Sequence, residues 1–254
     1  MARPGKGRAL VNVVIQRLAR RAVMIAVAAV ALGLLAFAAD DIDGFAVRQV
    51  VTALVSSGLA WGLAALLAGR TAPDRRAAVT GATALLVSAT LVYYLLILTV
   101  SRRWSGGSLM DGSSADRYGL RSLAVMTTAW LLVSMVAGPS LGLLGQMTRT
   151  APVPSAALAA GAACGLLSGQ GWQEIATTPT GRLWAIGGPN TALVRGIGAA
   201  ELVEVILPLA VLVWLATRRR LWHAWPILFG ATVVTATLSA LCWHLLRIAA
   251  VQLG

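Results

Sequence analysis

Charged residues are scarce in this chain. They make up 12% of its 254 residues, with only nine acids, whereas hydrophobic residues make up 58%. Soluble domains carry roughly a quarter charged residues and about half apolar ones, so the composition excludes an ordinary soluble protein. Lipid is the solvent that this composition indicates. The formal charge of +12 would suggest nucleic acid in a soluble protein. Here the arginines flank apolar segments, where they contact anionic headgroups, and no nucleic-acid partner is expected.

Cysteine and histidine are equally rare, with two residues of each. Cys164 and Cys242 both fall inside apolar stretches, without a CxxC pair and without histidine at metal-ligand spacing. This pattern excludes a disulfide framework and a cysteine metal site, and predicts two small buried apolar side chains. The sequence also lacks an HExxH motif, a P-loop and paired catalytic aspartates. We therefore expect no enzyme, no bound metal and no covalent cofactor.

What the chain has in abundance is long apolar runs. Each is roughly 18 to 26 residues long, against the ~20 that a helix needs to cross a ~30 Å hydrocarbon core. They predict an all-α, polytopic transmembrane helix bundle with seven spans, at residues 22–39, 48–69, 77–100, 122–147, 153–171, 197–217 and 223–247. Residues 1–21 then form a basic cytoplasmic segment, residues 22–247 the transmembrane bundle and residues 248–254 a short external tail.

The distribution of basic residues predicts the orientation. Six of them and no acid lie in residues 1–21, and with this end inside, thirteen of the 21 lysines and arginines are cytoplasmic. The positive-inside bias therefore predicts a cytoplasmic N-terminus and an external C-terminus. Tryptophans near the span ends predict aromatic belts, and not a ligand site: Trp104, Trp172 and Trp243 outside, and Trp214, Trp222 and Trp225 inside.

The first span has two interpretations. Ala36-Phe37-Ala38 follows a 14-residue apolar core and resembles a signal-peptide cleavage site, and cleavage would leave six spans with unchanged topology. A retained anchor is favoured because further membrane segments follow and the basic leader is long. Residues 9–20 also show the pattern of a short amphipathic helix on the inner membrane surface.

Small residues recur at four-residue intervals in several spans. Gly161, Gly165 and Gly169 clear one face of the fifth span, so that a partner helix can approach closely. The same kind of face occurs at Gly138 and Gly142 in the fourth span and at Gly58 and Gly62 in the second. We expect the fourth and fifth spans to form an antiparallel hairpin along these faces. Self-association or a protein partner is the alternative use, and Pro139 is expected to kink the fourth span.

Four ionisable residues form the sharpest site hypothesis. Glu201 and Glu204 lie in the outer part of the sixth span, and the seventh brings His244 and Arg247 to a similar depth. Ionisable groups within a membrane are expensive and hence candidates for binding a cation or passing a proton. The alternative is that helix dipoles and headgroups account for all four. Pro208 lacks the amide that would bond the Glu204 carbonyl, which favours a kink and an opened, polar-lined segment.

Two segments carry a resemblance to a known family. Residues 80–103, with Tyr93-Tyr94, and residues 136–171, with Ala137-Gly138-Pro139 and the following glycines, resemble a family of small multi-pass membrane proteins from actinobacteria. The resemblance covers roughly residues 50–220. It implies an integral membrane protein of a family known only as a domain of unknown function. Its fifth span often ends in an acid where this chain has Gln170, so no functional residue carries over.

The sequence thus predicts a protein of a bacterial cytoplasmic membrane, surrounded by membrane lipids. A non-catalytic subunit of a membrane complex, or a scaffold, is the first prediction. The alternative is a transporter of a small solute, cation or proton that uses the acids of the sixth span. No internal repeat of the kind common in secondary transporters is evident in the sequence, which disfavours transport.

Overall fold

A computed structural model describes residues 5–40, 42, 51, 58–108, 114–177 and 191–253, and the regular secondary structure in these ranges is helical. The α-helices are α1 (Gly5–Ala39), α3 (Gly58–Arg70), α4 (Arg75–Leu96), α5 (Asp116–Thr150), α6 (Val153–Thr177), α8 (Thr191–Arg218) and α9 (Trp225–Leu253). A π-helical turn (Ile97–Ser101) follows α4, and a 3-10 turn (Leu221–Ala224) precedes α9. These ranges contain no β-strand, so the predicted all-α class is confirmed.

Four of the described helical segments are long and apolar enough to cross a membrane. They are Ala19–Ala39, Arg75–Ser101, Asp116–Thr150 and Leu221–Leu245, and α3 is a shorter apolar helix. Most of the first ten residues of the predicted span 48–69 lie outside the described residues. Length and apolarity thus indicate a membrane protein.

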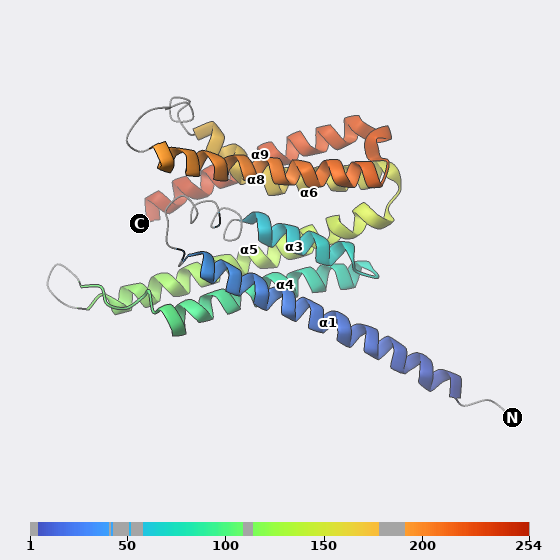
Figure 1. The fold of residues 1–254 in the computed structure, drawn as a ribbon, viewed down its shortest axis with the longest axis horizontal. Coiled ribbons are helices and arrows are strands. Elements are labelled where there is room, and N and C mark those ends of the chain that lie inside the picture. The colour runs from blue at the N-terminus through green and yellow to red at the C-terminus, as the bar shows by residue number, and fades with distance from the viewer. Residues whose placement is uncertain are drawn as a thin grey trace.

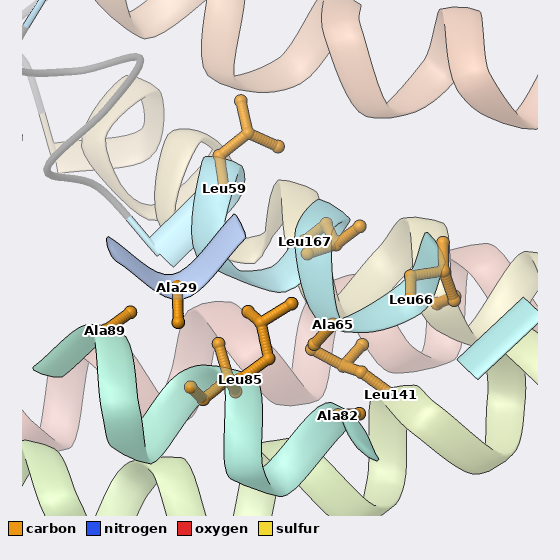
Figure 2. Close-up of a cluster of buried hydrophobic side chains, with 11 residues drawn as sticks. Ala29, Leu59, Ala65, Leu66, Ala82, Leu85, Ala89, Leu141 and Leu167 are labelled. Carbon is orange, nitrogen blue, oxygen red and sulfur yellow. The ribbon is translucent and has the colours of Figure 1, made fainter. Parts of the chain in front are cut away.

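The helices form two groups that pack side by side. In Figure 1, α6, α8 and α9 lie together, while α1, α3, α4 and α5 form the other group. Contacts of α6 with α3 and α5 join the two. Figure 2 shows the core of the second group, where α1, α3, α4, α5 and α6 meet around Ala65, Leu85, Leu141 and Leu167.

The distribution of side-chain size is inverted relative to a soluble protein. Alanines dominate the buried positions, whereas large apolar side chains such as Phe229 and Val23 are mostly exposed. In water such a surface would promote aggregation, but in lipid it faces acyl chains that are equally apolar. Small residues inside allow close helix packing, which is what holds helices together in a bilayer.

The glycine face of α6 packs on α9. A Cβ atom on Gly165 would lie 2.5 Å from the carbonyl oxygen of Thr232, and Gly161 and Gly169 meet α9 in the same way, at Leu228 and Ser239. The prediction that this face packs on the preceding span is therefore wrong. That span, α5, instead places Gly138 and Gly142 against Thr83 and Ala78 of α4. In the second span, Gly62 lies against Leu167 of α6, while Gly58 has more room.

Two ends of helices have clear local causes. Asp74 caps α4, because its Oδ1 accepts a 2.8 Å hydrogen bond from the Ala77 amide. Arg220, with φ of 53°, adopts the left-handed conformation that ends α8 before the 3-10 turn. Neither Pro139 nor Pro208 ends its helix, since α5 and α8 continue past them. The segment predicted as a separate amphipathic helix, 9–20, belongs to the unbroken α1.

Candidate functional site

A cavity of about 730 Å³ lies between the two helix groups. This volume is in the range of small-molecule sites, which run from about 300 to 1,000 Å³. Residues of α1, α3, α4, α5, α6, α8 and α9 contribute to its wall, so every described α-helix borders it. Helix α6 joins the two groups through its contacts with α3 and α5.

Aromatic rings are concentrated on the wall of this cavity. Trp61, Tyr93, Tyr94, Trp130 and Trp243 line it, although the whole chain has only fifteen aromatic residues. Tyr93 and Tyr94 meet edge to face, with ring centroids 5.1 Å apart. Such rings offer apolar contact and negative π-faces that attract cations. Trp243, predicted as a membrane-belt residue, also borders the cavity.

The polar groups on the wall are few and differ in character. Thr90 and Ser134 share a buried hydrogen bond of 3.2 Å between α4 and α5, and the Ser140 hydroxyl donates to the Val136 carbonyl. Gln170 and Glu204 supply an amide and a carboxyl group. Glu204 is therefore the one ionisable acid among the described residues that line the cavity.

Glu204 is held at the wall by close packing. Its side chain is buried, with 6% of the residue exposed, and a Cβ atom on Gly171 of α6 would lie 2.9 Å from its Cβ. Only glycine at position 171 leaves room for α8 to approach α6 so closely. Pro208, one turn further along α8, is also fully buried. Packing therefore fixes the position of the carboxyl-bearing turn of α8.

The cavity opens at the outer surface of the bundle beside α5. Leu132 and Val136 border it, yet they are 64% and 71% exposed. Cys242 of α9 also lines it and is exposed, so the prediction of a buried cysteine holds for Cys164 and is wrong for Cys242. A molecule dissolved among lipid chains could reach the cavity through such an opening.

The structure brings only part of the predicted ionisable cluster to the cavity. Glu204 lines it, whereas the side chain of His244 is exposed and does not border it. The side chains of Glu201 and Arg247 lie outside the described ones. Among the described residues, no group of three histidine, cysteine or acidic side chains is arranged to hold a metal ion.

An ion pair lies next to the cavity, at the end of α1. Asp40 accepts hydrogen bonds from the Tyr93 hydroxyl at 2.7 Å and from Arg103 at 2.9 Å. Arg103 also lies over the ring of Phe37, 5.8 Å from its centroid. The contact joins residues more than fifty positions apart, and no local pattern in the sequence signals it.

Comparisons with known proteins add nothing to this site, because no protein-family model, curated protein or solved structure matches the chain. The resemblance to the actinobacterial membrane family stays a prediction from sequence.

Proposed function

We propose that this chain is a multi-pass protein of the bacterial cytoplasmic membrane that binds an amphiphilic organic cation in its cavity and transports it. In this proposal the chain crosses the bilayer seven times, with the N-terminus inside and the C-terminus outside. The observation that carries the binding role is the placement of Glu204, a buried carboxyl group on the wall of an otherwise largely apolar, aromatic-lined cavity.

The chemistry of the wall favours a cation with apolar substituents. Tryptophan and tyrosine faces stabilise a cation by about 0.5–2 kcal/mol each, depending on how well water is excluded. A carboxylate adds a direct electrostatic attraction, which is strong where the dielectric constant is low. The exposed positions of Leu132 and Val136 support entry from the lipid phase, where such amphiphiles accumulate.

Binding can be tested with tetraphenylphosphonium as the probe and purified full-length protein in lipid nanodiscs. Wild type is expected to bind the probe, and Glu204→Gln to bind it at least about tenfold more weakly, because the variant keeps the side-chain size but loses the charge. Glu174→Gln is the matched control, since Glu174 is an acid of α6 that does not line the cavity. Equal affinity of wild type and Glu204→Gln would refute the proposal.

A neutral probe of similar shape distinguishes recognition of the charge from non-specific hydrophobic binding. Triphenylphosphine oxide should bind wild type and Glu204→Gln alike, because it carries no net charge. Transport itself is tested by uptake of the cation into proteoliposomes. The rate should fall in Glu204→Gln and stay unchanged in Glu174→Gln.

A second role, as a non-catalytic subunit or scaffold of a membrane assembly, is supported by α1. This helix has 35 residues, about 52 Å at 1.5 Å per residue, and its N-terminal part stands clear of the other helices in Figure 1. An extended basic helix of this kind offers a surface to a partner. Stoichiometric co-purification of another protein from native membrane would support this role, and a lone monomer in mild detergent would count against it.

A further inference from the structure

Four arginines gather at the end of the bundle opposite the ion pair of Asp40. Arg70 is the last residue of α3, Arg149 lies in the last turn of α5, and Arg218 and Arg219 are at the end of α8. Three helices thus end together, and their last carbonyl groups favour positive charge. The helix ends explain why arginines occur here, but not why their guanidinium groups lie so close together.

Direct contacts bring the guanidinium groups together around Thr148, which is fully buried. Arg70 donates a 2.9 Å hydrogen bond from Nη1 to the Thr148 hydroxyl, and Arg219 donates from Nε to the Thr148 carbonyl at 3.1 Å. Arg219 also donates to the carbonyl of Arg149, whose own guanidinium donates to the carbonyl of Ala72. A network of hydrogen bonds therefore holds three of the four charges close to one another.

The positive charge of this cluster is not balanced by any acid that the structure describes. Within the described part of the chain, none of the four arginines lies within ion-pair distance of a carboxylate. Asp74, the acid of the neighbouring turn, uses its Oδ1 to cap α4. The pKa of Arg70 is lowered by burial and then by the positive charges of Arg219, Arg149 and Arg218. Like charges at this spacing repel, so an anion between them would stabilise the arrangement.

The cluster also has an apolar side. The guanidinium carbons of Arg70 and Arg218 lie 5.6 Å and 5.3 Å from the centroid of the Trp214 ring. Trp214 is itself exposed on the outer surface of α8. Tryptophan prefers the depth at which lipid headgroups meet the hydrocarbon, because one end of its ring system is polar and the other apolar. The charged cluster and a lipid-facing aromatic surface are therefore continuous.

We propose that Arg70, Arg149, Arg218 and Arg219 form a binding site for the phosphate of an anionic phospholipid, with one acyl chain against Trp214. Guanidinium groups match phosphate oxygens with paired N–H donors, and each has five donors, of which the contacts above use at most two. Basic pockets between membrane helices are suited to anionic headgroups. This inference does not depend on the cavity or on its ligand.

The test uses purified full-length protein and measures retained lipid by native mass spectrometry after incubation with phosphatidylglycerol or phosphatidylcholine. Wild type should retain phosphatidylglycerol and little phosphatidylcholine. Arg70→Gln and Arg219→Gln should lower phosphatidylglycerol retention by about tenfold, because each removes a charge and its paired donors. Arg76→Gln is the matched control: an exposed arginine at the same end of the bundle, outside the cluster.

Arg218→Gln tests lipid binding in a variant that should fold normally. The Arg218 side chain is exposed, and its contact among the described residues is with the Trp214 ring. The variant should reduce phosphatidylglycerol retention several-fold while the melting temperature stays unchanged. Retention that is equal in wild type, Arg218→Gln and Arg219→Gln would overturn the proposal. Complete displacement of the lipid by millimolar inorganic phosphate would overturn the assignment to a lipid, since it would identify a site for a soluble anion.

Discussion

The hydroxyl of Tyr93 donates a 2.7 Å hydrogen bond to Asp40, which joins the end of α1 to α4. Arg103 donates to the same carboxylate oxygen, so one acid fastens the first helix to the segment that follows α4. Ala36, the first of the residues that resemble a cleavage site, and Ala39, just after them, are buried. The retained first helix stays a prediction from the sequence.

Replacement of Asp40 by asparagine should therefore destabilise the protein. The variant loses the ion pair with Arg103 and weakens the hydrogen bond from Tyr93. Leaving these groups without their partner lowers the free energy of unfolding by about 1–3 kcal/mol. Thermal unfolding of the purified protein in detergent measures the effect. Arg103→Gln should lower the melting temperature, whereas Arg102→Gln should not, because the exposed Arg102 makes no side-chain bond among the described residues. Equal melting temperatures for all three variants and wild type would contradict the prediction.

Gly165→Ala should weaken the contact between α6 and α9. The new methyl group would meet the Thr235 side chain and the Thr232 carbonyl oxygen, 2.5 Å away, and backbone cannot move aside cheaply. Overpacking of this kind costs about 1–3 kcal/mol. Gly230→Ala is the control on α9, because nothing lies within 4 Å of the added atom. A melting temperature that falls for position 165 and holds or rises for position 230 is the expected result.

The hydrogen bond between Thr90 and Ser134 can be measured by a double-mutant cycle. Thr90→Val and Ser134→Ala each remove one partner of a buried 3.2 Å contact. Hydrogen bonds between helices in membrane proteins contribute about 0.6 kcal/mol on average, with a maximum near 1.7. We expect a coupling energy in this range from reversible unfolding in mixed micelles. A coupling energy of zero would show that the two hydroxyls act independently.

Seven spans with an internal N-terminus predict which loops a membrane-impermeant maleimide can reach. In a background without Cys164 and Cys242, Ser108→Cys should react in intact cells, because the turn after α4 is external in this topology. Thr71→Cys, in the turn between α3 and α4, should react only after permeabilisation. Both residues are exposed in the structure, so burial does not limit labelling. Labelling of both in intact cells would refute the topology.

Sequence reasoning predicted the helical class and most helix positions because hydrophobic run length is a local property. Residues 77–100 and 122–147, for example, fall within the helical segments Arg75–Ser101 and Asp116–Thr150. It failed where the partner of a face had to be chosen. The glycines of α6 are visible in sequence, but whether they meet α5 or α9 depends on how the whole bundle assembles.

The candidate site was predicted only in part for the same reason. Glu204 stood out because an acid within an apolar run is costly, and the structure places it on the cavity wall. Trp61 and Trp130 were not predicted as site residues, because the sequence does not distinguish a tryptophan within a span from any other large apolar residue. His244, expected beside the acids, has its side chain exposed, because the rotation of α9 about its axis is set by packing against α6.

The sequence by itself determined that this protein prefers lipid as its solvent. It also determined the helices, because backbone groups in lipid must form their hydrogen bonds within each segment. Only the tertiary structure decided that two helix groups leave a cavity between them, that five aromatic rings and Glu204 surround it, and that four arginines converge at one end. The physical reason is the separation along the chain between the residues that interact. A helix forms from neighbours four residues apart, whereas a cavity or a charge cluster depends on contacts between residues that are far apart in the chain.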